Sequence, residues 1–117
     1  MDIKQIGEDM AALNRALRFD EAGEKYWSPD VVSIEPESDT PHSYCRGIEE
    51  VRAKSAWFES VAKVHSVEVE GPFINRDQFC LRYVMDMERA DTGHFTMTEI
   101  GLYTVREGKV VEERFFY

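Results

Sequence analysis

Apolar residues recur at helical spacing in the first part of the chain. Between Ile3 and Ala22 the inward stripe of a helix is expected to hold Ile6, Met10, Leu13 and Leu17, with charged residues on the other side. A second, short helix is predicted over Phe19–Trp27. It ends at Ser28-Pro29-Asp30, because proline lacks a backbone donor and restricts the residue before it.

A short strand is predicted over Val31–Glu35, followed by a loop over Pro36–Tyr44 that is rich in Pro, Ser and Asp. A third helix is expected to start after Gly47, with Trp57 on or beside its inward stripe. The residues predicted to face inward on this helix are Ile48, Val51, Ser55, Phe58 and Val61.

From Val64 onward the period changes to two, which is typical of antiparallel strands. The predicted strands are Val64–Ile74, Gln78–Arg89, Phe95–Val105 and Lys109–Phe116. Helices followed by a meander of strands predict an α+β fold, in which the N-terminal helices pack on the sheet.

The register of the last hairpin depends on the turn at Val105-Arg106-Glu107-Gly108-Lys109. A three-residue loop with a bulge needs a left-handed residue at its third position, which Gly108 provides. The expected pairs are Val105 with Lys109, Tyr103 with Val111, Gly101 with Glu113, Glu99 with Phe115 and Met97 with Tyr117. A two-residue turn would instead put Glu113 beside Leu102, on the opposite face.

The turn before it, Ala90-Asp91-Thr92-Gly93-His94, has its glycine in the same place. The same rule pairs Met87 with Met97, Met85 with Glu99 and Tyr83 with Gly101. One face then collects Phe79, Leu81, Tyr83, Met85, Met87, Phe95, Met97, Tyr103, Val111, Phe115 and Tyr117. Glu99 and Glu113 are the carboxylates on this apolar face.

The opposite face carries both polar and apolar residues, which suits contact either with solvent or with another subunit. Its polar members are Arg82, Asp86, Glu88, Thr96, Thr98, Thr104, Glu112 and Arg114. Its apolar members are Ile100, Leu102, Val110 and Phe116.

Composition narrows the class of protein. A chain of 117 residues with 43% hydrophobic residues is long enough for one domain, so residues 1–117 are predicted to form a single unit. Cys45 and Cys80 have no metal-ligand or redox spacing and are expected to be reduced. The net charge of −9, without a basic cluster, argues against nucleic acid and anionic membranes as partners.

The N-terminal sequence MDIKQIGEDM has neither a basic region nor an apolar run, so no secretory signal is predicted. No apolar stretch is long enough to span a bilayer. A cytoplasmic protein without a membrane anchor is therefore expected.

Three features together resemble the SnoaL-like family of the nuclear transport factor 2-like superfamily. They are Ile34-Glu35-Pro36 at the end of an early strand, Arg46-Gly47 before a helix, and the terminal GKVVEERFFY. The resemblance covers the whole chain and implies a cone-shaped fold whose curved sheet encloses a pocket. It also implies a homodimer that contacts through sheet faces. The superfamily includes isomerases, cyclases, dehydratases, epoxide hydrolases and non-catalytic binding domains.

The residues match only part of the family's known catalytic sets. Members similar to ketosteroid isomerase carry their general base just before a proline, and Glu35-Pro36 matches that place with Glu for Asp. Their oxyanion-donating Asp falls near Gly101 and their Tyr near Ala12 or Leu13, so both donors are missing here. The His and Asp of SnoaL-like cyclases fall near Glu113 and Phe115 and are not reproduced. The Arg-Asp-Asp set of limonene epoxide hydrolase-like members is not recognisable.

Glu35, Glu99 and Glu113 are therefore the candidate acid/base groups. Apolar burial and neighbouring like charge raise the pKa of a glutamate toward the range useful for proton transfer at neutral pH. Such groups suit enolisation, aldol-type cyclisation or dehydration of an apolar carbonyl compound, without a metal or organic cofactor. His65 shares parity with Val67 and Val69 and is a further candidate. The expected pocket residues are Trp57, Tyr83, Met85, Met97, Gly101, Tyr103, Phe115, Tyr117 and Arg46.

Each of these groups also has a structural interpretation. A buried glutamate can be paired with an arginine such as Arg46 or with a Tyr hydroxyl, and a histidine at a strand end can be purely structural. Two functional hypotheses follow: a small enzyme that uses carboxylate acid/base chemistry, or a non-catalytic ligand-binding or dimerisation module. A third hypothesis, a protein-binding outer sheet face, rests on Ile100, Leu102, Val110 and Phe116.

Overall fold

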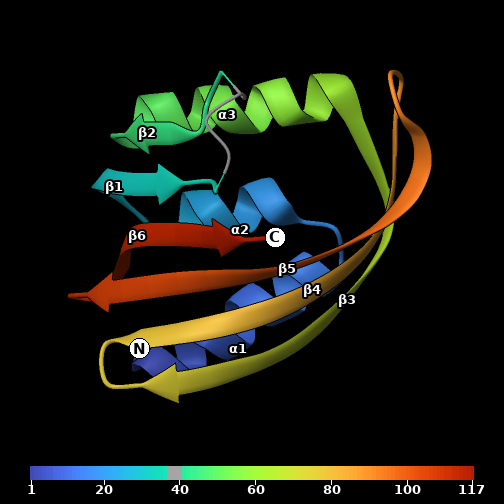
Figure 1. The fold of residues 1–117 in the computed structure, drawn as a ribbon. Helices are drawn as coiled ribbons and strands as arrows, with labels where there is room; N and C mark the ends of the chain where they lie inside the picture. Colours follow the sequence, from blue (N-terminus) through green and yellow to red (C-terminus); the bar gives the residue numbers. More distant parts are fainter. Residues whose placement is uncertain (37–40) are drawn as a thin grey trace.

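The computed structural model describes residues 1–36 and 41–117, and in these residues three helices accompany one six-stranded sheet (Figure 1). The helices are α1 (Ile3–Arg15), α2 (Phe19–Tyr26) and α3 (Ile48–Val61). The strands are β1 (Trp27–Ile34), β2 (Tyr44–Arg46), β3 (Ala62–Asn75), β4 (Gln78–Arg89), β5 (Gly93–Arg106) and β6 (Lys109–Phe116). The predicted α+β class is confirmed. No helix of the described part of the chain is long and apolar enough to cross a membrane.

The sheet order is β2-β1-β6-β5-β4-β3. All neighbouring strands are antiparallel except β1 and β6, which pair in parallel. This parallel pair joins the early part of the chain to its C-terminal end. The long strands β3, β4 and β5 curve, with α1 on the concave side near one end and α3 beside β2 at the other (Figure 1).

The first helix is shorter than the sequence pattern predicts. α1 starts with a capping box, in which the Asp2 side chain accepts from the Gln5 backbone and the Gln5 side chain accepts from the Asp2 backbone. It ends at Arg15, because Leu17 adopts a left-handed φ of 63° that no helix can continue through. The predicted inward position of Leu17 is therefore wrong, and its side chain is 42% exposed.

β1 starts four residues earlier than predicted and runs through Pro29. Its pairing with β6 is irregular between Trp27 and Val32, so the proline does not interrupt a regular ladder. The predicted loop over Pro36–Tyr44 lies partly outside the described residues, and its last residue begins β2. This short strand was not predicted from the sequence.

The hairpin between β4 and β5 keeps the predicted faces but shifts the partners by two residues. Tyr83 pairs with Glu99 and Leu81 with Gly101, whereas the turn rule placed Gly101 opposite Tyr83. The difference arises because Gly93 is itself the first paired residue of β5. A shift of two preserves the side of the sheet on which every side chain lies.

The predicted three-residue loop between β5 and β6 is wrong. Arg106 pairs with Lys109, so the turn consists of Glu107 and Gly108, with φ angles of 52° and 77°. A bulge then leaves Val111 without a paired residue on β5, because the register shifts between Thr104 and Val105.

The bulge brings Glu113 back to the inner face, directly opposite Tyr103. The alternative that placed Glu113 beside Leu102 on the other face is therefore also wrong. Val110, expected on the outer face, pairs with Val105 and is fully buried on the inner side. The largest buried side chains of the core include Phe79, Ile6, Leu81, Met87, Val31 and Val51.

Candidate functional site

Three strands, β1, β5 and β6, bring the candidate glutamates toward the same region of the inner face. Glu113 on β6 pairs with Ser33 on β1, and Glu35 follows two residues later with the same parity. Glu99 lies on β5, and Gly101, two residues along that strand, pairs with Phe115 of β6. The charges of Glu35 and Glu113 both act on the Glu99 carboxyl. The three acids thus form one electrostatic cluster.

Glu113 is held by two fixed donors. The Trp27 indole Nε1 donates to Oε1 at 2.8 Å, and the Ser33 hydroxyl donates to Oε2 at 2.7 Å. The Glu113 residue is only 7% exposed, and Ser33 is fully buried. Both carboxylate oxygens therefore have a protein donor, which is the arrangement that makes a buried acid tolerable.

Lys54 on α3 connects the other groups. Its Nζ donates to the Ser33 hydroxyl oxygen at 2.6 Å and lies 3.4 Å from Glu35 Oε2. It also lies 5.0 Å from the centroid of the Phe115 ring, within the range of a cation–π contact. Ser33 is consequently a relay that accepts from Lys54 and donates to Glu113.

Glu35 has an incomplete set of partners. The Tyr117 hydroxyl donates to Oε1 at 3.3 Å, while Oε2 is buried and has no hydrogen-bond partner among the described residues. Burial raises the pKa of the Glu35 carboxyl, the charge of Lys54 opposes this rise, and Glu113 adds to it. Glu35 is thus a carboxyl with an increased tendency to take up a proton.

Glu99 is half-buried and makes no hydrogen bond or ion pair with any residue that the structure describes. Burial raises the pKa of Glu99 to about 8, and the negative charges of Glu35 and Glu113 contribute to the rise while Lys54 opposes it. The carboxyl is therefore protonated at neutral pH. A protonated, partly accessible acid without a protein partner is free to donate to a ligand.

Two buried tyrosines lie beside this cluster. The hydroxyls of Tyr83 and Tyr103 are 2.5 Å apart, and Asn14 Nδ2 on α1 donates to Tyr83 at 2.9 Å. Burial raises the pKa values of both hydroxyls, so they remain protonated. A side chain at Gly101 would meet the Tyr103 hydroxyl at 2.7 Å, so the glycine makes room for this ring.

The structure does not bring His65 to the cluster. A bulge between Val64 and Ser66 takes His65 off the inward parity of β3. Its Nε2 lies 2.6 Å from Glu88 Oε1, and its ring is 5.3 Å from that of His94. The expectation that His65 reaches the interior is therefore wrong.

The other predicted pocket residues fall into different places. Trp57 on α3 is half-buried, with its ring 5.7 Å from that of His42, and Arg46 is exposed at the end of β2. The cation beside Glu35 is thus Lys54 and not Arg46. Met85 is buried, whereas Met97, directly opposite it in the ladder, is half-buried.

Lys54, Ser33 and Trp27 are the site residues that sequence reasoning missed. Lys54 follows Val51 by three residues on the inward stripe of α3, where Ser55 was the predicted inward residue. Ser33 has the parity of the buried Val31. For both Lys54 and Ser33, a polar residue at a position where the pattern expects an apolar one could have indicated a site residue. Trp27 was placed at the end of a helix, so its role in a strand was not foreseen.

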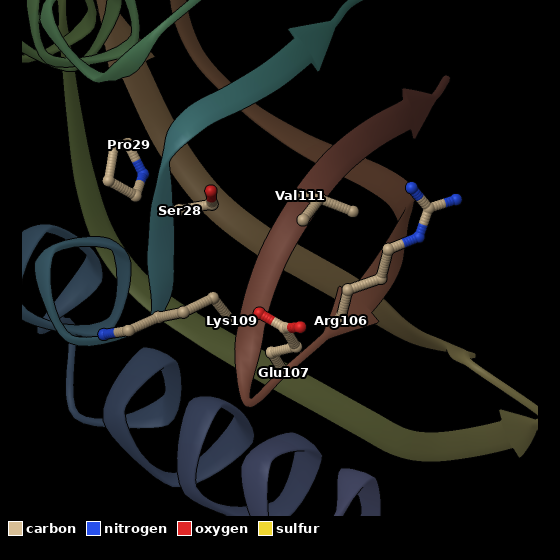
Figure 2. Close-up of a pocket in the computed structure, with 6 residues that line it drawn as sticks. All are labelled: Ser28, Pro29, Arg106, Glu107, Lys109 and Val111. Atoms are coloured by element: carbon tan, nitrogen blue, oxygen red, sulfur yellow. The ribbon is translucent and has the colours of Figure 1, made fainter.

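Two surface hollows are lined by residues other than Glu35, Glu99 and Glu113. One, of about 690 Å³, lies between the start of β1 and the β5–β6 turn, where Arg106 and Lys109 extend away from one another (Figure 2). The other, of about 290 Å³, lies between α2 and α3 and reaches Trp27. In residues 1–36 and 41–117 no group of three or more His, Cys, Asp or Glu side chains is arranged to hold a metal ion.

Comparisons with known proteins agree with this architecture. A Mesorhizobium loti protein, provisionally described as a SnoaL-like polyketide cyclase and also as a carbohydrate phosphatase, is 42% identical, with 100% of each chain covered and a TM-score of 0.93. A nuclear transport factor 2-like protein of unknown function from Burkholderia pseudomallei is 11% identical over 94% of this chain and 86% of its own, with a TM-score of 0.79.

A third solved structure is that of a Catenulispora acidiphila protein with a ketosteroid isomerase-like fold, in complex with trimethylamine. It is 14% identical over 92% of this chain and 80% of its own, with a TM-score of 0.72. No curated protein matches the sequence. The SnoaL-like domain model matches residues 1–117. The chain therefore belongs to the SnoaL-like family and has the nuclear transport factor 2-like fold.

Proposed function

We propose that this protein catalyses proton transfer on a small apolar carbonyl compound, with Glu99 as the acid and Glu35 as the base. The observation that carries the proposal is the state of Glu99: half-buried, without a protein partner, and with a pKa raised to about 8. A general acid works best when its pKa lies near the operating pH.

The neighbouring groups support a division of roles. In the proposed step, Glu35 removes a proton from the carbon next to the carbonyl, and Glu99 donates its proton to the carbonyl oxygen, which gives the enol. Lys54 places a positive charge beside this oxygen's developing negative charge. Glu113 already accepts from Trp27 and Ser33, so its role is to hold the Ser33–Lys54 relay in place.

Half-buried apolar side chains beside the acids, those of Met97 and Phe115, suit an apolar ligand. The description of the Mesorhizobium loti relative as a polyketide cyclase also supports carbonyl chemistry, because closing a polyketide ring requires removal of a proton next to a carbonyl. Every proposed step uses only side chains of this chain.

A second candidate function is ligand binding without turnover. It is favoured by the fixed partners of Glu113, and by the ion pair of Glu35 with Lys54, which stabilises the carboxylate. In that case Glu99 would be a neutral hydrogen-bond donor that recognises a ligand oxygen. The two functions differ in whether a carbon-bound proton of the ligand exchanges.

Deuterium exchange tests the proposal without knowledge of the natural substrate. Phenylacetone and β-tetralone are incubated with the protein in deuterated water, and loss of the proton signals next to the carbonyl is followed by NMR. We expect exchange above background with the wild type, and a decrease of about 100-fold or more in Glu99→Gln and Glu35→Gln.

The matched control is Glu68→Gln, which makes the same change at an exposed position on β3 and is expected to leave the rate unchanged. Binding of the ketones is measured separately by ligand-observed NMR. Binding without exchange in the wild type would contradict the enzymatic proposal and support the binding module.

A further inference from the structure

Lys54 has an environment unlike that of the other lysines. Its side chain is 14% exposed, whereas Lys4, Lys25, Lys63 and Lys109 are exposed residues. Its Nζ lies near the face of the Phe115 ring and beside the buried Oε2 of Glu35. A lysine amine acts as a nucleophile once a neighbouring group has accepted its proton, and the Glu35 carboxylate lies 3.4 Å away.

We propose that Lys54 is a covalent site for carbonyl compounds, at which its amine forms an iminium ion with an aldehyde or ketone. This inference deepens the proposed function and rests on it for the class of ligand. It names Lys54 as the group that would activate the carbonyl, in addition to the acids that move protons.

The groups around Lys54 supply what the reaction needs. Glu35 takes one proton from the Lys54 ammonium group, which leaves a free amine. The amine attacks the carbonyl carbon, a C–N bond forms, and a proton moves from nitrogen to oxygen to give a carbinolamine. Glu99 then donates its proton to the hydroxyl group, the C–O bond breaks, and water leaves as the nitrogen lone pair forms the C=N bond.

The products are an iminium ion on Lys54, one water molecule, a neutral Glu35 and a Glu99 carboxylate. Carbon-bound protons next to an iminium are more acidic than those next to the parent carbonyl, and the Glu99 carboxylate is the base left in the site. Ser33 acts as a positioning residue, because its bond to Glu113 fixes the hydroxyl oxygen that accepts from Nζ at 2.6 Å.

Access to the amine is limited but present. The Lys54 side chain is 14% exposed and that of Glu35 is 17% exposed, so part of each side chain reaches solvent, although Glu35 Oε2 itself is buried. The buried remainder is walled by Ser33 and the Phe115 ring. The Phe115 ring is the apolar surface beside the amine, which suits an apolar carbonyl compound.

The test uses benzoylacetone, an aryl β-diketone that traps reactive amines as a stable conjugated enamine. The full chain is incubated with the diketone, and the modified residue is located by peptide mass mapping. We expect a mass increase of the diketone minus one water on Lys54, formed about tenfold faster than on any other lysine. A second trap, borohydride reduction with phenylacetone, is expected to fix a secondary amine at the same residue.

Lys54→Arg keeps the positive charge but cannot form the adduct, and it is expected to lose the fast labelling. Lys63→Arg is the matched control at an exposed lysine and is expected to retain it. Because labelling is mapped on the wild-type chain, the result does not depend on the folding of any variant. Labelling of Lys54 no faster than that of the exposed lysines would overturn the proposal.

The outcomes separate this inference from the proposed function. Deuterium exchange that is lost in Glu99→Gln but kept in Lys54→Arg would overturn the covalent role and leave the acid/base function intact. Fast labelling of Lys54 in a protein that exchanges no ketone protons would support the reactive amine and contradict the proposed enzymatic function.

Discussion

The Ser33 hydroxyl donates to Glu113 Oε2 at 2.7 Å, and its oxygen accepts from Lys54 Nζ at 2.6 Å. This single buried hydroxyl therefore connects an acid on β6 with a cation on α3. The same two charges act on the other carboxyls, because Lys54 lowers and Glu113 raises the pKa values of Glu35 and Glu99.

Ser33→Ala is expected to destabilise the fold. The change leaves Glu113 with one donor instead of two and removes an acceptor from Lys54, so a loss of about 1–3 kcal/mol is expected in the free energy of unfolding. Urea denaturation at neutral pH measures it. Ser60→Ala, which removes an exposed hydroxyl that bonds the Trp57 carbonyl, is the control and is expected to change stability by less than about 0.5 kcal/mol. Equal effects of the two substitutions would contradict the relay.

Stability is expected to fall as pH rises through the range set by Glu99. Its pKa is near 4.5 when unperturbed and about 8 in the fold, so the folded state holds more protons than the unfolded state between these values. The wild type is therefore expected to lose a few kcal/mol between pH 5 and pH 8, in the order of 1 kcal/mol per pH unit.

Glu99→Gln removes this group's contribution, so its stability is expected to depend less on pH and to exceed that of the wild type at pH 8. Glu35, whose pKa is also raised, contributes in the same direction and remains in this variant. Urea titrations at several pH values measure the slopes, with Glu68→Gln as control. Parallel slopes in wild type and Glu99→Gln would argue against a raised pKa.

The contact between Gly101 and Tyr103 predicts a specific coupling. Gly101→Ala places a methyl group 2.7 Å from the Tyr103 hydroxyl and is expected to cost about 1–3 kcal/mol. Tyr103→Phe in the same chain removes the closest atom and is expected to recover part of that loss. Tyr83→Phe breaks the same hydrogen bond but leaves the Tyr103 hydroxyl over the glycine, so it is expected to recover nothing. A double-mutant cycle on thermal stability separates these cases.

A homodimer through the outer sheet face remains a proposal. Ile100 and Phe116 face each other across β5 and β6 and are 41% and 47% exposed. We expect the wild type to have the mass of a dimer in light scattering and Ile100→Lys to have that of a monomer. Ile74→Lys changes a similarly exposed residue at the far end of β3 and serves as control. A monomeric wild type would rule out the dimer.

The faces of the long strands could be predicted from the sequence, because side-chain parity survives a shift of two residues. Tyr83, Glu99 and Glu113 lie on the predicted side although each has a different partner from the one expected. For Glu113 the face was restored by two departures that offset each other, a shorter turn and a bulge at Val111. The local sequence does not indicate this bulge, which places both Val110 and Glu113 on the buried inner face.

The centre of the site was harder to predict, since it depends on contacts between distant segments. The parallel pairing of β1 with β6 brings Ser33 to Glu113, and no local pattern specifies that pairing. Lys54 was detectable as a polar residue on the inward stripe of α3, but its partners were not. His65, in contrast, was predicted to lie in the site and does not. One bulge in β3 reverses its side-chain parity, on which that prediction rested.

Titration of the Glu99 carboxyl is the most direct test of the proposed chemistry. With carbon-13-labelled glutamate and assignment by Glu99→Gln, NMR follows the carboxyl signal against pH. An inflection near 8 is expected in the wild type. A higher one is expected in Lys54→Met, because the positive charge that lowers this pKa is removed. An inflection near the ordinary value of 4.5 in the wild type would contradict the assignment of Glu99 as the acid.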